Sequence, residues 1–150
     1  MNRILLKSRT LSVSINRKPK IIYEFVLNLD NLPRWAKMFC RSIKLLNREW
    51  IAKTPQGQAK VRITERNDLG ILDHYVKLLS SPDDEVFVPM RVVQNGDGSE
   101  VIFTVFQLVG MSEEKYAEDI RMVEQDLQNL NNIVEESIPN NNDNDKKANR

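Results

Sequence analysis

The chain contains few of the residues from which disulfides, metal centres and membrane spans are built. It has one cysteine, Cys40, and one histidine, His74, among its 150 residues. An intramolecular disulfide and the usual zinc ligand sets are therefore excluded. No apolar run approaches the roughly 20 residues of a membrane span, and the apolar stretch at residues 4–6 is far shorter than that of a signal peptide. We expect a soluble, cytoplasmic protein without a cofactor.

Sequence motifs that carry well-known chemistries are also missing. The 5 glycines form no phosphate-binding loop ahead of a helix, and no serine stands in a nucleophile elbow. The carboxylates form no cluster with the spacing of a calcium-binding loop. His74 is the first candidate for proton transfer, because histidine is the side chain that titrates near neutral pH.

The net charge of +1 conceals an uneven distribution of charge along the chain. Residues 1–66 hold 15 Lys and Arg against 4 Asp and Glu, whereas residues 67–150 hold 7 against 17. Such a split can mark a basic surface for nucleic acid or anionic lipid. The basic residues are spread out rather than clustered, so we favour a fold in which both charges mix on one surface. We therefore expect no nucleic-acid partner.

The first forty residues predict a strand followed by two short helices. Residues 11–15 alternate apolar and polar side chains, which is the period of a half-buried strand. Pro19 stands where the first turn of a helix tolerates proline, and apolar residues follow it at helical spacing. A second short helix is predicted next, and its apolar side consists of Trp35, Met38 and Phe39.

From residue 41 to residue 108, short strands alternate with tight turns. The clearest turn is Asn95-Gly96-Asp97-Gly98, which joins strands predicted at 85–94 and 100–108. Connections this short require antiparallel neighbours, since a parallel crossover needs a dozen or more residues. The pattern predicts an antiparallel meander of six strands, with the strand at 11–15 joining one edge.

A long helix is predicted after Ser112, which can cap its first turn. Apolar residues recur there at spacings of three and four, and the resulting stripe consists of Tyr116, Ile120, Val123, Leu127, Leu130 and Val134. A coiled coil would use the same spacing, but a single helix after a sheet more often buries its stripe on that sheet. Residues 139–150 are mostly Asn, Asp and Lys and predict a disordered tail. We expect one domain over residues 1–138.

This order of elements resembles the helix-grip fold of the START-like (SRPBCC) superfamily, which includes birch-pollen-allergen-type, polyketide cyclase/dehydrase and lipid-transfer proteins. The resemblance covers nearly all of the predicted domain and is strengthened by residues 35–39, 72–74 and 103–111. It is greatest to small bacterial members that carry the polyketide cyclase label by similarity. The resemblance implies an α+β fold in which a curved antiparallel sheet of about seven strands wraps the long C-terminal helix. An apolar cavity between sheet and helix is expected with it.

Strand alternation indicates which residues face that cavity. Leu72, His74 and Val76 form the more apolar set of their strand, so they should point inward, and Asp73 should point outward. Asp73 and His74 therefore cannot act as an acid–base pair on one strand. We expect the ligand-binding residues to be Trp35, Met38, Phe39, His74, Val76, Met90, Arg91, Phe103, Tyr116 and Ile120.

Each of these residues also has a purely structural interpretation. His74 fits either a catalytic base or a strand histidine satisfied by a neighbouring carbonyl or hydroxyl. Arg91 is either a hydrogen-bond donor to a ligand or a solvated strand residue. Tyr116 is either a hydrogen-bond donor to a ligand or the first residue of the apolar stripe in the core. Cys40 fits a reactive thiolate or an inert buried thiol. The apolar residues of the predicted second helix suit either a cavity mouth or ordinary core.

Three functions follow from these features. The favoured one is the binding of a small, mostly apolar molecule, such as a lipid, a polyketide-like compound or an aromatic metabolite, by a carrier or sensor. The second is an enzyme of the cyclase/dehydratase kind, in which His74 moves a proton. The third is a protein-interaction module or homodimer with a collapsed cavity.

Overall fold

The computed structural model describes residues 4–137, so the tail predicted at 139–150 lies outside the described residues. The described elements confirm the predicted order of a strand, short helices, a run of strands and a long helix. They are β1 (Ser8–Ile15), α1 (Pro19–Leu27), η1 (Leu29–Asn31), α2 (Leu32–Trp35), β2 (Ser42–Leu46), β3 (Glu49–Thr54), β4 (Gly57–Ile63), β5 (His74–Leu78), β6 (Glu85–Val88), β7 (Met90–Asn95), β8 (Gly98–Phe106) and α3 (Glu113–Ser137).

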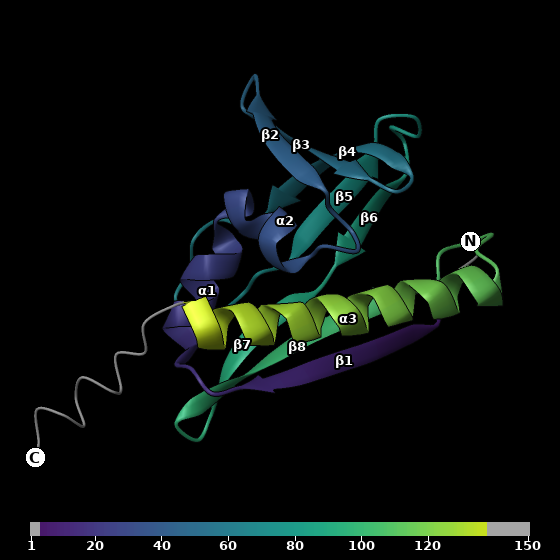
Figure 1. Ribbon diagram of the computed structural model, residues 1–150. Coiled ribbons are helices and arrows are strands. Elements are labelled where there is room, and N and C mark those ends of the chain that lie inside the picture. The colour runs from purple at the N-terminus through teal and green to yellow at the C-terminus, as the bar shows by residue number, and fades with distance from the viewer. Residues whose placement is uncertain (1–3, 138–150) are drawn as a thin grey trace, which may run out of the picture.

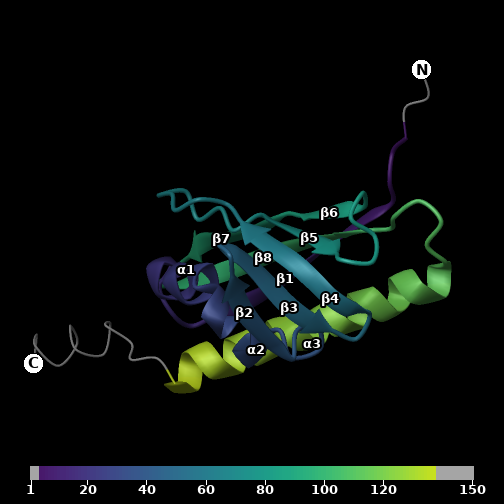
Figure 2. The ribbon, with the colours of Figure 1, turned by 90° about the horizontal axis from the view of Figure 1, so that it is seen from above.

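The strands form a curved antiparallel surface that partly surrounds α3 (Figures 1 and 2). One sheet has the strand order β1-β8-β7, and the other has the order β2-β3-β4-β5-β6. The first strand of the chain therefore joins the last, with Ser8 opposite Phe106 and Ile15 opposite Ser99. Helix α3 lies along this smaller sheet and contacts β1 and β8.

The two sheets meet where the chain passes Asp73 and Pro89. The amide of Leu72 donates to the carbonyl of Met90 in β7 at 2.8 Å. Two residues later His74 begins β5, which pairs with β6 in the larger sheet. One extended segment thus bonds first to one sheet and then to the other, which joins them into one curved surface.

The strand predicted at 85–94 is divided into β6 and β7, so eight strands take the place of about seven. Pro89 lies at the break and has no backbone N–H to donate to a neighbouring strand. Its carbonyl instead accepts a hydrogen bond from Thr104 in β8 at 3.0 Å. A single apolar run in the sequence therefore serves both sheets.

The second short helix is shorter than the sequence predicts. Helix α2 ends at Trp35, and Met38 and Phe39 lie in the turn that follows it. The amide of Met38 donates to the side chain of Asp126 in α3 at 2.9 Å rather than to a helical carbonyl. A tertiary contact thus replaces the next turn of helix.

The apolar stripe of α3 packs onto the fold as predicted. Leu130 and Val134, in the second half of the helix, are fully buried together with Ile22 of α1 and Leu72. The solid core therefore lies at the end of the molecule where α1 meets the C-terminal half of α3 (Figure 1). None of the helices described between residues 4 and 137 is long and apolar enough to cross a membrane.

Candidate functional site

A large cavity lies at the other end of the core, beside the first half of α3. Its volume is about 1090 Å³. The walls come from α2 and the turn after it, from β4, β5 and β6, from β8, and from the part of α3 between Lys115 and Asn129. The solid core and the hollow half of the fold thus share the same long helix.

The inner wall of this cavity is mostly apolar. Adjacent strands of the larger sheet contribute Val61, Val76 and Val88, because alternate residues of a strand share one face. Strand β8 adds Phe103 and Val105 from the smaller sheet. An apolar wall with a few polar groups is typical of sites that bind small molecules.

The cavity reaches the surface between α3 and two loops. Its lining includes Lys37 and Met38 after α2, Gln56 in the turn between β3 and β4, and Arg121 and Gln125 on α3. All five side chains are solvent-exposed. The rim is therefore polar and charged, whereas the interior is apolar.

His74 brings one polar ring into this apolar wall. Its Nδ1 lies 3.0 Å from the carbonyl oxygen of Leu72, and its ring meets that of Phe103 edge to face with centroids 5.8 Å apart. A carbonyl oxygen can only accept, so Nδ1 carries the proton of the neutral ring. Burial lowers the pKa of His74 below 6.5. The ring is therefore neutral at physiological pH, and Nε2 keeps its lone pair.

Asp126 is a buried carboxylate in the cavity wall that we did not predict from the sequence. Its residue is only 5% exposed, and its Oδ1 accepts from the amide of Met38 at 2.9 Å. Burial raises the pKa of Asp126 to about 6, although hydrogen bonds from the amides of Met38 and Phe39 act in the opposite direction. Asp126 ties the turn at the rim to α3. A signal was available, since position 126 falls three residues after Val123 and four before Leu130 on the apolar stripe.

We predict that Asp126→Asn raises the free energy of unfolding at pH 7 by about 1–2 kcal/mol, because it removes a buried charge and keeps an acceptor for Met38. The pKa of this carboxyl is raised from 3.8 to about 6 on folding, so its stabilising contribution is complete below pH 4 and is lost as the pH rises through 6. The variant should lack this loss between pH 4 and 6. Urea unfolding at several pH values measures both effects.

Glu124→Gln provides the matched control for Asp126→Asn. Glu124 lies on the same helix with a side chain that is 51% exposed, so the substitution changes the net charge equally without removing a buried charge. We expect little change in stability from it. A Glu124→Gln variant that gained as much stability as Asp126→Asn would assign the effect to net charge rather than to burial. Equal pH profiles for wild type and Asp126→Asn would also contradict the prediction.

Six of the residues proposed from the sequence lie together in the cavity wall: Trp35, Met38, Phe39, His74, Val76 and Phe103. They come from three parts of the chain, namely the segment 35–39, strand β5 and strand β8. Met38 is 45% exposed at the rim, whereas Trp35 is 3% exposed. The indole Nε1 of Trp35 is buried without a hydrogen-bond partner among the described residues.

The other four proposed residues lie outside the cavity lining. Met90 is fully buried in the core, and Ile120 is 7% exposed on the packed side of α3. Tyr116 is also buried, and its hydroxyl donates to the carbonyl of Val105 at 2.8 Å. Arg91 is an exposed residue of β7 that forms an ion pair with Asp73.

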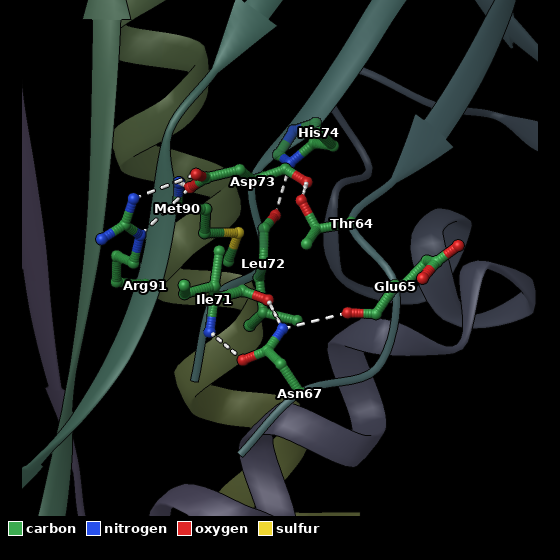
Figure 3. A network of polar contacts seen from close by, with 9 residues as sticks. All are labelled: Thr64, Glu65, Asn67, Ile71, Leu72, Asp73, His74, Met90 and Arg91. Carbon is green, nitrogen blue, oxygen red and sulfur yellow. Dashed lines mark hydrogen bonds and ion pairs between the residues drawn. The ribbon is translucent and has the colours of Figure 1, made fainter. Parts of the chain in front are cut away.

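Asp73 points away from His74 and toward Arg91 (Figure 3). Its Oδ2 lies 3.0 Å from Nη2 of Arg91, and its Oδ1 accepts from the amide of Met90 at 2.9 Å. Burial alone would raise the pKa of Asp73, but the hydrogen bonds from Arg91 and Met90 lower it below 3.8. Asp73 and His74 are adjacent in sequence but serve different faces of the sheet.

Cys40 fits the interpretation of an inert buried thiol. It is 1% exposed, its Sγ donates to the carbonyl of Ser42 at 3.3 Å, and burial raises its pKa to about 11. The thiolate is the reactive form of cysteine and is scarce at neutral pH when the pKa is this high. Within residues 4–137, moreover, no three His, Cys, Asp or Glu side chains gather as a metal site would require.

Solved structures with the same arrangement come from different sources. XoxI from Bacillus cereus matches with a TM-score of 0.67 and 18% identity, over 86% of this chain and 96% of that chain. Ara h 8.0201 matches with a TM-score of 0.65 and 11% identity, over 86% and 97%. CalU16 from Micromonospora echinospora matches with a TM-score of 0.62 and 16% identity, over 89% and 77%. No protein-family model matches the chain, and no curated protein matches it in sequence.

The chain therefore has the helix-grip fold that its order of elements predicted. A curved antiparallel sheet wraps a long C-terminal helix, with short helices after the first strand. At these levels of identity the similarity shows the fold, and it does not define a ligand or a reaction.

Proposed function

We propose that the protein binds one small, mostly apolar molecule in the cavity between the sheet and α3, as a carrier or sensor. The observation that carries the proposal is the cavity itself, with its volume of about 1090 Å³ and its open rim. Sites for small molecules commonly have volumes of about 300–1,000 Å³, so this one suits a lipid or a polycyclic compound. The proposed contacts are Trp35, Phe39, His74, Val76 and Phe103.

The packing of the fold supports this proposal over a collapsed interaction module. Side chains normally fill protein interiors with few voids larger than a water molecule. Here Leu130 and Val134, toward the C-terminal end of α3, are fully buried, while the part of the helix between Lys115 and Asn129 borders the cavity. A cavity with an apolar interior and a polar rim is the arrangement that an apolar ligand requires.

Blocking the cavity tests the proposal directly. We predict that Val76→Phe weakens the binding of 2-methoxynaphthalene by about fivefold to a hundredfold, since the larger side chain overpacks the occupied cavity and overpacking typically costs 1–3 kcal/mol. Val93→Phe is the matched control, because Val93 is 42% exposed on β7 and lies outside the lining. Titration calorimetry gives the dissociation constants, and urea unfolding verifies that both variants fold.

Native mass spectrometry of protein purified without detergent complements this titration. A discrete adduct that is present on wild type and Val93→Phe but absent from Val76→Phe would place the ligand in the cavity, and extraction would identify its class. If 2-methoxynaphthalene bound all three proteins equally, or none of them, the cavity would not be the binding site and the proposal would fail.

Proton transfer by His74 is a second candidate function, and the state of the ring favours it. A neutral imidazole whose Nδ1 is held by Leu72 presents an unprotonated Nε2, as a general base requires. The extracted ligand distinguishes the two functions. A carrier returns it unchanged after incubation, whereas an enzyme converts it in the native protein and not in His74→Phe.

A further inference from the structure

The ring of His74 has one nitrogen that hydrogen-bonds within the fold and one that does not. Nδ1 is committed to the carbonyl of Leu72 at 3.0 Å. No hydrogen bond from any residue between 4 and 137 reaches Nε2, which the Nδ1–H tautomer leaves as an acceptor. A polar atom of this kind inside a protein is normally completed by water or by a ligand.

This free nitrogen has access to the cavity. His74 lies deep within the protein, where burial lowers its pKa, and yet the residue keeps part of its surface accessible. It also belongs to the cavity lining. The described side-chain atoms that are buried without a partner are Nε of Arg17, Nε1 of Trp35 and Oδ1 of Asn131, and Nε2 of His74 is not among them. Nε2 is therefore an accessible atom, and the place of His74 in the lining makes the cavity the space beside it.

The side chains that surround His74 are apolar. Its neighbours across the strands are Ile63 on β4 and Val88 on β6, and its ring contacts that of Phe103. Asp126, the buried carboxylate of the same cavity, already accepts from the amides of Met38 and Phe39. Nε2 is thus the acceptor of this apolar part of the wall, whereas Asp126 and other polar groups of the lining, such as Asp119 and Gln125, lie on α3.

We propose that the natural ligand carries a hydroxyl group, phenolic or alcoholic, that donates a hydrogen bond to Nε2 of His74 while its apolar body fills the cavity. The inference rests on the proposed function, because it specifies the ligand of the same cavity. Carboxylic acids are disfavoured as ligands, because their ionised carboxylate would face the lone pair of Nε2 and has no proton to donate to it. His74 is accordingly the residue that determines specificity.

Three probes with one ring system separate these ligand classes. At neutral pH 2-naphthol offers a hydroxyl donor, 2-methoxynaphthalene an oxygen without a donor, and 2-naphthoate a carboxylate. Wild type should bind 2-naphthol about three- to tenfold more tightly than 2-methoxynaphthalene, the equivalent of one neutral hydrogen bond. It should bind 2-naphthoate most weakly of the three. Titration calorimetry at neutral pH measures all three dissociation constants.

Two variants of His74 assign the preference to Nε2. His74→Phe keeps a ring against Phe103 but has no acceptor, so it should bind 2-naphthol and 2-methoxynaphthalene equally. His74→Gln carries an amide oxygen at a similar distance from the backbone and should restore part of the preference. Phe103→Leu, which alters the apolar wall, should weaken both probes together and keep their ratio. Urea unfolding verifies that each variant is folded.

The outcomes separate this inference from the proposed function. If 2-methoxynaphthalene binds in the cavity but wild type shows no preference for 2-naphthol, the hydroxyl assignment is wrong and cavity binding stands. A preference for 2-naphthoate would overturn the assignment as well. A preference for 2-naphthol that persists in His74→Phe would assign the hydroxyl to another acceptor. Failure of all probes to bind would instead contradict the proposed function.

Discussion

Replacing Gly70 with alanine should lower the free energy of unfolding by about 3 kcal/mol or more, because the fold has no room for the added methyl group. A Cβ at position 70 would lie 2.2 Å from the backbone oxygen of Val92, and backbone cannot move aside as a flexible side chain can. Gly70 also has a φ of 71°, a conformation that disfavours side chains. Its carbonyl accepts from the amide of Val92 at 3.0 Å, so relieving the clash would break that bond.

Gly96→Ala separates the two causes of this effect. Gly96 has a φ of 57° in the turn between β7 and β8, and a Cβ there would meet nothing within 4 Å. The Gly96→Ala variant should lose only about 1–2 kcal/mol of its free energy of unfolding, which is the cost of a side chain in this backbone conformation. Urea unfolding of both variants gives the difference, which measures the clash. Equal losses for the two variants would show that the segment at 70–72 can move away from β7, contrary to the packing that we describe.

The fold was predictable because its elements have strong local patterns. The alternation at 11–15, the turn at 95–98 and the apolar stripe from Tyr116 to Val134 each indicate one element without reference to the rest of the chain. Short connections then require antiparallel neighbours. The order of elements completes the prediction, since it resembles one known fold and the solved structures confirm that fold.

The limits of the prediction lie where distant parts of the chain meet. Nothing local shows that Met38 donates to Asp126, a contact across 88 positions that ends α2 early. The sheet change at Pro89 is similar, because an apolar run looks the same whether it serves one sheet or two. Proline was a local sign of the break, but only its partner in β8 shows which way the chain turns.

The sequence predicts which side of each element faces inward, but it does not predict which inward-facing residues line the cavity. Alternation correctly turns His74 and Val76 inward, since neighbours on a strand point to opposite sides. The same argument puts Met90 on the apolar face of its strand and Ile120 on that of α3, and both residues are buried outside the cavity lining. Periodicity identifies the inner face of an element, and it contains no information on where along that face the packing gives way to a cavity.

The polar network around Asp73 holds together the place where the two sheets meet (Figure 3). Its backbone carbonyl accepts from the amide and the hydroxyl of Thr64, at 2.9 and 2.7 Å. Its carboxylate binds the amide of Met90 and the guanidinium of Arg91. The residue that follows it is His74, so this network fixes the start of β5 and with it the position of the ring in the cavity wall.

Asp73→Ala should therefore lower the free energy of unfolding by about 2–4 kcal/mol, because it leaves the buried amide of Met90 without an acceptor and removes the ion pair. Asp73→Asn keeps an oxygen for Met90 and loses only the ion pair with Arg91. That pair is worth about 1 kcal/mol or less, since the arginine side chain is 48% exposed. Urea unfolding of both variants thus separates the backbone contact from the ion pair. Equal losses would assign the whole effect to charge.

The pH dependence of these variants provides an independent check on the role of Asp73. The pKa of this carboxyl is lower in the folded protein than its ordinary value of 3.8, so its contribution is complete above that value and is lost as the pH falls through the folded pKa. Wild type should therefore lose stability on acidification below about pH 4, and Asp73→Asn should lose less.

The pH dependence expected from Asp73 is opposite in sign to that expected from Asp126, whose contribution is lost as the pH rises through about 6. The two buried carboxylates thus set opposite limits: the charged form of Asp73 stabilises the sheet junction, whereas burial in the cavity wall disfavours the charged form of Asp126. The two contributions are separate if Asp73→Asn loses less stability than wild type below pH 4 but has the same pH dependence as wild type between pH 4 and 6.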